Sequence, residues 1–331
     1  FEAPALSADQ VWALPTADGS ANQVLKTDGS GALSWASAAT NLDGLSDSKS
    51  AGTNFTGSLL VGHQTTGTLN AAQYNTGVGL ASLDALTTGD NNTAVGYAAL
   101  TANTTGTTNT ATGYYSLKSN TTGSGNTASG IRSLQENTEG DYNTAFGNQS
   151  LRANTTGDNN TASGYMSLLS NTTGTRNLAI GKGAYDAADT ENDNLAIGYD
   201  ALGGSIAGGE QNIAIGNFSL DANTTGDNNS AVGHNALSAN TTGAGNTASG
   251  AYALYTNTTG DYNSAFGINS LKVSEGGDNN TALGWNSLYL NTSGANNTAI
   301  GSEAGDVITT GGNNVIIGSG ADPSAKRLLN T

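Results

Sequence analysis

The sequence has no cysteine, only three prolines and few charged side chains, and each shortage excludes a class of protein. Without cysteine there is neither a disulfide framework nor a thiolate metal site. Charged residues make up 11% of the chain, whereas disordered chains usually carry more charge and more proline. Hydrophobic residues reach only 36%, so an ordinary globular core is not expected for a chain of this length.

Positive charge is also scarce: ten Lys and Arg stand against 26 Asp and Glu, for a net charge of −16. Nucleic acids and anionic membrane surfaces are bound through clustered Lys and Arg, so neither is an expected partner. No apolar run approaches the roughly 20 residues of a membrane-spanning helix, and no membrane insertion is expected. The sequence starts at Phe1 without a signal peptide, so we expect a processed product or a fragment.

Glycine is abundant, with 47 residues, and much of it belongs to one repeat. The motif Asn-Thr-Ala-x-Gly, whose last residue we call the marker glycine, recurs every 17 residues, with one 18-residue step from Gly198 to Gly216. Asn stands four residues before the marker glycine, Ala usually two before it, and Leu usually four after it. The unit is approximately N-T-A-x-G-x-x-S-L-x-x-N-T-T-G-x-x. The marker glycines are Gly79, Gly96, Gly113, Gly130, Gly147, Gly164, Gly181, Gly198, Gly216, Gly233, Gly250, Gly267, Gly284, Gly301 and Gly318.

A unit of 17 residues is too short for a helix pair, and it suits one coil of a β-solenoid with two short strands and two turns. Asn-Thr-Ala-x-Gly predicts a strand with Ala and Gly on one face and Thr and x on the other. The Leu is expected to anchor a second strand, and Asn-Thr-Thr-Gly predicts a turn. Coils stacked about 4.8 Å apart would align identical residues in ladders. The predicted ladder residues are Asn92, Ala94, Gly96, Leu100, Asn109, Gly113, Leu117, Asn126, Gly130, Leu134, Asn143, Gly147 and Leu151.

A single coil has few bulky side chains to bury, so we expect the narrow Ala and Gly face to pack against further copies of the chain. The predicted fold is an all-β solenoid, or β-roll, whose chains are intertwined or lie side by side in parallel. Residues 1–50 are predicted to form an N-terminal connector or capping β module, 51–318 the rod, and 319–331 a C-terminal tail or junction. Within the module, residues 24–35 predict a hairpin with its turn at 28–31.

Three stretches resemble tail fibres of tailed phages, especially those that infect marine bacteria and cyanobacteria. They are LPTADGSANQVLKTDGSGALSW (14–35), NLDGLSDSKSAGTNFTGSLLVGHQTTGTLNAAQYNTGVG (41–79) and NNVIIGSGADPS (313–324). The repeat is also similar to the heads of trimeric autotransporter adhesins, which are left-handed parallel β-rolls with shorter repeats.

The resemblance implies a homotrimeric fibre in the virion, in contact with other tail or fibre proteins. It also implies a host receptor, either a glycan or an outer-membrane component. The alternative is a bacterial adhesin or filament of the same architecture, outside the cell or on its surface. A third reading is a single-chain ice-binding solenoid, which would carry a flat Thr face.

Aromatic residues just after the marker glycines are candidates for binding sugars by stacking. The alternative is that they pack between coils or between chains. These residues are Tyr97, Tyr114, Tyr165, Tyr199, Tyr252 and Trp285.

Other polar motifs have structural alternatives. Asp residues recur in Gly-Asp-(Asn/Tyr)-Asn turns, where they would either bind calcium or cap the turn. The Asn-Thr-Thr sequons are either glycosylation acceptors or simply repeated turns. The two histidines, His63 and His234, lie far apart and have no Cys partner. We therefore expect no catalytic residues, no resident metal or cofactor, and no enzymatic activity. The Asp residues concerned are Asp90, Asp141, Asp158, Asp227, Asp261 and Asp278.

Overall fold

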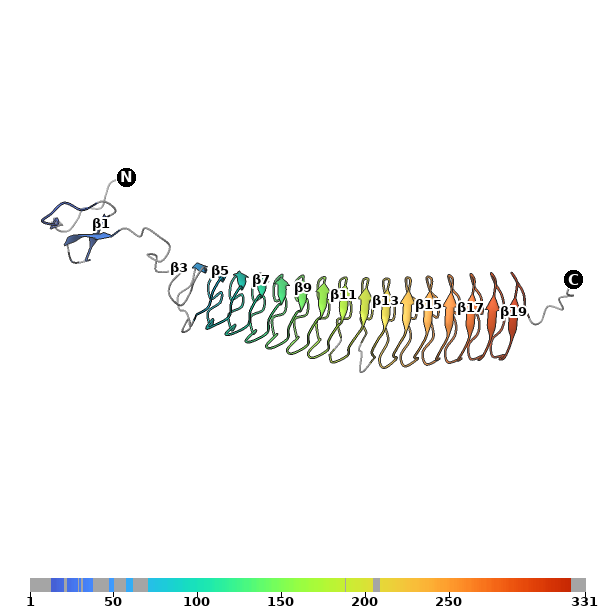
Figure 1. Cartoon of the computed structure of the whole chain (residues 1–331). Coiled ribbons are helices and arrows are strands. Elements are labelled where there is room, and N and C mark those ends of the chain that lie inside the picture. The colour runs from blue at the N-terminus through green and yellow to red at the C-terminus, as the bar shows by residue number, and fades with distance from the viewer. Residues whose placement is uncertain are drawn as a thin grey trace, which may run out of the picture.

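The structure, a computed structural model, describes residues 13–20, 23–28, 30, 32–37, 48–50, 58–61, 71–187, 189–204 and 209–322. Over these ranges the chain forms a small antiparallel hairpin and a long row of parallel strands joined by turns, without a helix (Figure 1). Accordingly, none of these residues belongs to a helix that could cross a bilayer. His63 and residues 323–331 lie outside the described residues.

The predicted N-terminal hairpin is confirmed. Strand β1 (Gln23–Thr27) pairs antiparallel with β2 (Leu33–Ser37) across the turn. The carboxylate of Asp28 closes this turn, because its Oδ1 accepts backbone N–H groups from Ser30 at 2.8 Å and Ala32 at 3.1 Å. These bonds favour the ionised form and lower the pKa of Asp28.

The rod is one sheet of very short strands, stacked in sequence order (Figure 1). Strand β3 (Ser48–Ser50) pairs antiparallel with β4 (Leu59–Val61), and every later strand pairs parallel with its predecessor in unshifted register. Among the described strands no pairing joins β19 back to β3, so the sheet is open. The remaining strands are β5 (Thr76–Val78), β6 (Thr93–Val95), β7 (Thr110–Thr112), β8 (Thr127–Ser129), β9 (Thr144–Phe146), β10 (Thr161–Ser163), β11 (Leu178–Ile180), β12 (Leu195–Ile197), β13 (Ile213–Ile215), β14 (Ser230–Val232), β15 (Thr247–Ser249), β16 (Ser264–Phe266), β17 (Thr281–Leu283), β18 (Thr298–Ile300) and β19 (Val315–Ile317).

The prediction of a second strand in each coil is wrong. Leu100, which was expected to anchor it, lies in a turn with a φ of 51°, and Ala98 has a φ of 52°. Residues with positive φ alternate with residues of ordinary φ along this side of the coil. The backbone N–H and C=O groups here still form hydrogen bonds between coils. The N–H of Leu100 donates to the carbonyl of Ser116 at 3.1 Å, and that of Ala98 to Leu80 at 2.9 Å. Pairing between coils therefore satisfies this backbone without β geometry.

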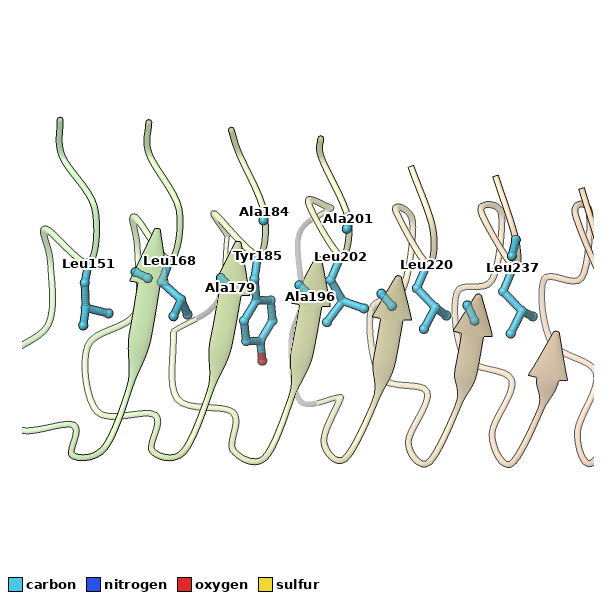
Figure 2. Close-up of a cluster of buried hydrophobic side chains, with 14 of the residues drawn as sticks. Leu151, Leu168, Ala179, Ala184, Tyr185, Ala196, Ala201, Leu202, Leu220 and Leu237 are labelled. Carbon is cyan, nitrogen blue, oxygen red and sulfur yellow. The ribbon is translucent and has the colours of Figure 1, made fainter. Parts of the chain in front are cut away.

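The prediction that the Ala face meets other chains is also wrong. Ala94, Ala111 and their equivalents have no exposed surface within the single chain. Figure 2 shows the reason: strand alanines such as Ala179 and Ala196 point into the coil, and leucines such as Leu168 reach toward them from the turn side. The coil thus buries its small and large residues against each other, and the opposite strand face is left outside.

The marker glycines have φ values that side chains rarely adopt. Gly96 has a φ of 134°, and a Cβ placed on it would lie 2.5 Å from the carbonyl oxygen of Gly113 in the next coil. The close approach of successive coils at this corner therefore requires glycine.

Candidate functional surfaces

An unbroken asparagine ladder runs inside the rod, as the sequence predicted. The backbone N–H of Asn92 donates to Oδ1 of Asn75 at 2.8 Å, and Nδ2 of Asn92 donates to the carbonyl of Gly106 at 2.9 Å. The same backbone-to-Oδ1 bond recurs in each coil as far as Asn314, whose N–H donates to Asn297 at 3.1 Å. Each asparagine thus ties its own coil to the coil before it.

A second ladder consists of the asparagines of the Asn-Thr-Thr-Gly turns. Nδ2 of Asn120 donates to Oδ1 of Asn103 at 2.8 Å and to the carbonyl of Gly123 at 2.9 Å. These sequon asparagines are fully buried, so a glycosyltransferase could not reach them in the folded coil. The geometry therefore favours the interpretation of the Asn-Thr-Thr motifs as repeated turns. The sequon asparagines are Asn103, Asn120, Asn154, Asn171, Asn223, Asn240 and Asn257.

The second ladder has two described defects toward its C-terminal end. Oδ1 of Asn257 is buried without a hydrogen bond, because the next coil carries Ser274 in place of Asn, and the Ser274 hydroxyl is itself unpaired. Oδ1 of Asn291 is unpaired for the same reason, since the next coil carries Ile308. Oδ1 of Asn171, nearer the middle of the rod, is buried without a partner as well, so the ladder is not fully satisfied at these coils.

The acidic turns use their carboxylates within the fold. Oδ1 of Asp141 accepts the backbone N–H of Ser124 at 2.6 Å, and Oδ1 of Asp158 accepts that of Asp141 at 2.7 Å. Asp90, Asp227, Asp261 and Asp278 do the same, so each carboxylate bonds to the coil 17 residues earlier, which differs from the local turn cap that the sequence suggested. Within the ranges that the structure describes, no three His, Cys, Asp or Glu residues are grouped so as to hold a metal ion.

The outer face of the sheet carries no charge. From β5 to β19 its outward side chains are the first and third residues of each strand, and all of them are Thr, Ser, Val, Leu, Ile or Phe. Several are large and well exposed, including Phe146 at 48%, Val232 at 43% and Leu283 at 47%. A monomer with a net charge of −16 therefore presents one long neutral and partly apolar surface.

This face is not a regular threonine lattice of the kind expected for ice binding. The first strand position is Thr in β6 to β10, but it is Leu178, Leu195 and Ile213 in the following strands. The third position is Ser or Thr in some strands and a large apolar residue such as Phe266 in others, without a fixed period. The outer face thus varies in chemistry along the rod.

Aromatic side chains gather at the corner after the strand, where the sequence analysis placed candidate ligand contacts. Tyr97 and Tyr114 stack with ring centroids 5.4 Å apart, and Tyr115 lies 4.0 Å from Tyr114. The Nζ of Lys118 lies 4.6 Å from the Tyr115 centroid. This cluster spans two coils.

A longer group, called the aromatic row below, follows in the C-terminal half of the rod. Tyr199 contacts Phe218, Phe218 contacts His234, and His234 contacts Tyr252, with centroids 5.2, 6.3 and 5.4 Å apart. The sequence predicted Tyr199 and Tyr252 here but not Phe218 and His234. From coil to coil, the aromatic residue of the row alternates between the first and the second position after the marker glycine. Tyr165 and Trp285 are exposed at this corner outside the row. The row comprises Lys182, Tyr199, Phe218, His234, Tyr252, Tyr255, Lys272 and Tyr289.

The leucine column is interrupted at one coil by Tyr185. This side chain is fully buried between Leu168 and Leu202, and its hydroxyl lies 2.5 Å from Nδ2 of Asn194 (Figure 2). Burial, followed by the negative charge of Glu191, raises the pKa of Tyr185. The tyrosine therefore stays neutral over the physiological pH range.

Three half-buried carboxylates on successive coils, those of Asp186, Asp200 and Asp221, lie close enough to interact. Burial raises the pKa of Asp186 and of Asp221, and in both cases the charge of Asp200 adds to the shift. This is the repulsion expected of like charges held on adjacent coils.

No protein-family model, curated protein or solved structure matches the chain significantly.

Proposed function

We propose that the chain is a structural fibre protein, the rod of a phage tail fibre that positions or mediates attachment to the host surface. Its fold suits a spacer. Backbone bonds join each coil to the next from β4 to β19, and side-chain ladders fill the interior. At about 4.8 Å per coil, this part of the rod extends for roughly 70 Å.

The uncharged outer face is the single observation that carries this proposal. Such a face on an acidic chain favours contact with another copy, because like charges would otherwise keep the copies apart. Phe146, Phe266 and the exposed aliphatic residues supply apolar area that water disfavours. Several parallel chains would cover this face and stiffen the rod. The number three comes from the resemblance to trimeric fibres, as does the placement in the virion.

The alternative is a bacterial surface or secreted adhesin of the same architecture, and the test is where the protein is found. An antibody against the folded rod, with gold detection in electron microscopy, should label the tails of phage particles from the source. Labelling of bacterial surfaces in cultures free of phage particles would overturn the phage assignment and support the adhesin. Labelling of neither would contradict both.

A further inference from the structure

The coil does not require aromatic residues at the corner where the aromatic row lies. The corner of another coil carries Asn148 and Gln149, and the Gln149 N–H donates to the carbonyl of Ile131 at 2.9 Å. In the row, the Tyr252 N–H makes the equivalent bond to His234 at 3.0 Å. Since polar residues give the same backbone geometry, folding alone does not explain the row.

The row is continuous over a distance that suits a chain-like ligand. Lys182 lies over the ring of Tyr199 at 5.0 Å, and Lys272 lies 5.0 Å from the centroid of Tyr252 and 5.7 Å from that of Tyr289. Six coil steps separate Lys182 from Tyr289, which at about 4.8 Å per step is roughly 29 Å. The other aromatic cluster, around Tyr114, reaches only two coils.

The chemistry of the row is mixed. Tyr199 and His234 are exposed, and Phe218 and Tyr252 are half-buried, so apolar ring surface remains open to solvent. Neighbouring rings meet at interplanar angles from 64° to 82° and so present both faces and edges. Tyrosine hydroxyls and lysine ammonium groups lie among the rings and can hydrogen-bond a polar ligand.

Both positively and negatively charged side chains occur in the row or next to its residues in the chain. Two lysines belong to the row, and Asp200 and Asp221 follow Tyr199 and Phe218 in the chain by one and three residues, in a chain with a net charge of −16. A strongly anionic polymer would meet repulsion there. A polyhydroxyl chain suits this surface, because its C–H faces can pack on the rings while its hydroxyls bond to carboxylates, ammonium groups and phenols.

We infer that the aromatic row binds a linear, largely uncharged polysaccharide that lies along the rod axis. This deepens the proposed function, on which it rests, by assigning receptor contact to the side of the rod.

Affinity electrophoresis of the full chain tests the inference, with dextran, laminarin or galactomannan cast in the gel as neutral probes and alginate as the anionic probe. The variant carries Phe218→Asn and Tyr252→Asn, because Asn235 and Asn269 already occupy the same coil position with similar positive φ. The matched control is Tyr115→Asn, which changes this position in the shorter cluster. Thermal melts and light scattering accompany each protein.

At least one neutral polysaccharide should retard the unchanged protein. The double variant should bind it at least tenfold more weakly, with the control, the melting midpoint and the particle mass unchanged. Absence of retardation by all neutral probes, retardation by alginate alone, or equal binding by the double variant would overturn the inference. The rod proposal is judged separately, by particle mass and shape, so either can fail alone.

Discussion

The backbone N–H of Asn126 donates to Oδ1 of Asn109 at 2.9 Å, so that a side chain in one coil fixes the height of the backbone in the next. Oδ1 of Asn126 then accepts the N–H of Asn143 at 2.8 Å, and its Nδ2 donates to the carbonyl of Gly140 at 2.7 Å. One buried residue type thus sets the register of the whole rod.

Removing one member of this ladder should loosen the rod locally. Asn126→Ala leaves the buried N–H of Asn143 without its acceptor, and we expect it to cost about 1–3 kcal/mol. Hydrogen exchange measures the effect as faster exchange of the Asn143 amide, with little change several coils away, since each coil contacts only its neighbours. Asn148→Ala, at an exposed corner, is the control and should leave the exchange rates unchanged. Equal protection in both variants would refute the role of the ladder.

Repairing a defect of the second ladder should stabilise the protein. Ser274→Asn supplies an Nδ2 donor to the unpaired Oδ1 of Asn257 and replaces a hydroxyl that is itself unpaired. Other coils accommodate Asn at this position, and we expect a gain of about 1 kcal/mol, seen as a higher denaturation midpoint. Ser302→Asn, at a corner outside the ladder, should give no such gain. A less stable Ser274→Asn variant would contradict the account of the defect.

The carboxylate cluster predicts a pH-dependent gain from Asp200→Asn. The folded pKa values of Asp186 and Asp221 lie above the ordinary value of 3.8, so the stability that they contribute is present below about pH 3.8 and is lost as the pH rises through the folded values. Removing the Asp200 charge lowers both pKa values and reduces that loss.

Thermal melts at pH 7 and pH 3 measure this difference. Asp200→Asn should melt higher than the unchanged protein at pH 7 and at nearly the same temperature at pH 3. The control for net charge is Glu303→Gln, which removes one negative charge at the equivalent position of another coil, two residues after its marker glycine. A gain of equal size at both pH values would rule out repulsion as its cause.

Close contact between the marker glycines predicts strong intolerance of any side chain. Gly113 has a φ of 131°, and its Cβ would lie 2.5 Å from the carbonyl oxygen of Gly130, so Gly113→Ala should cost about 3 kcal/mol. Gly320 has a φ of 59° with no atom within 4 Å of a Cβ, so Gly320→Ala carries only the smaller backbone cost. Denaturation midpoints compare the two, and similar losses would contradict the stacking argument.

Much of the rod could be predicted from sequence because the repeat is long and its period is fixed. The β-solenoid, the N-terminal hairpin and the ladder through Asn92 and Asn109 all follow from spacing and turn chemistry. Spacing does not reveal which way a small residue points, and so the Ala94 face was assigned to neighbouring chains and not to the interior.

The single strand per coil could not be predicted, because it contradicts local preference. Leu117 adopts a φ of 48°, which is unfavourable for a bulky residue. Burial of its side chain and the bond from its N–H to the carbonyl of Ser133 at 3.1 Å offset that cost, and both depend on the next coil. The aromatic row was missed in part for a related reason, because its contacts join residues at different positions of successive coils.

Light scattering coupled to size exclusion, with negative-stain microscopy of the same peak, measures whether the uncharged face joins copies of the chain. The proposal predicts straight rods whose mass is a whole multiple of 32.9 kDa, threefold if the resemblance holds. Phe266→Asp combined with Val232→Asp, which places charge on that face, should reduce the mass to one chain. A monomer for the unchanged protein at micromolar concentration, or an unchanged multiple after the two substitutions, would contradict the central claim.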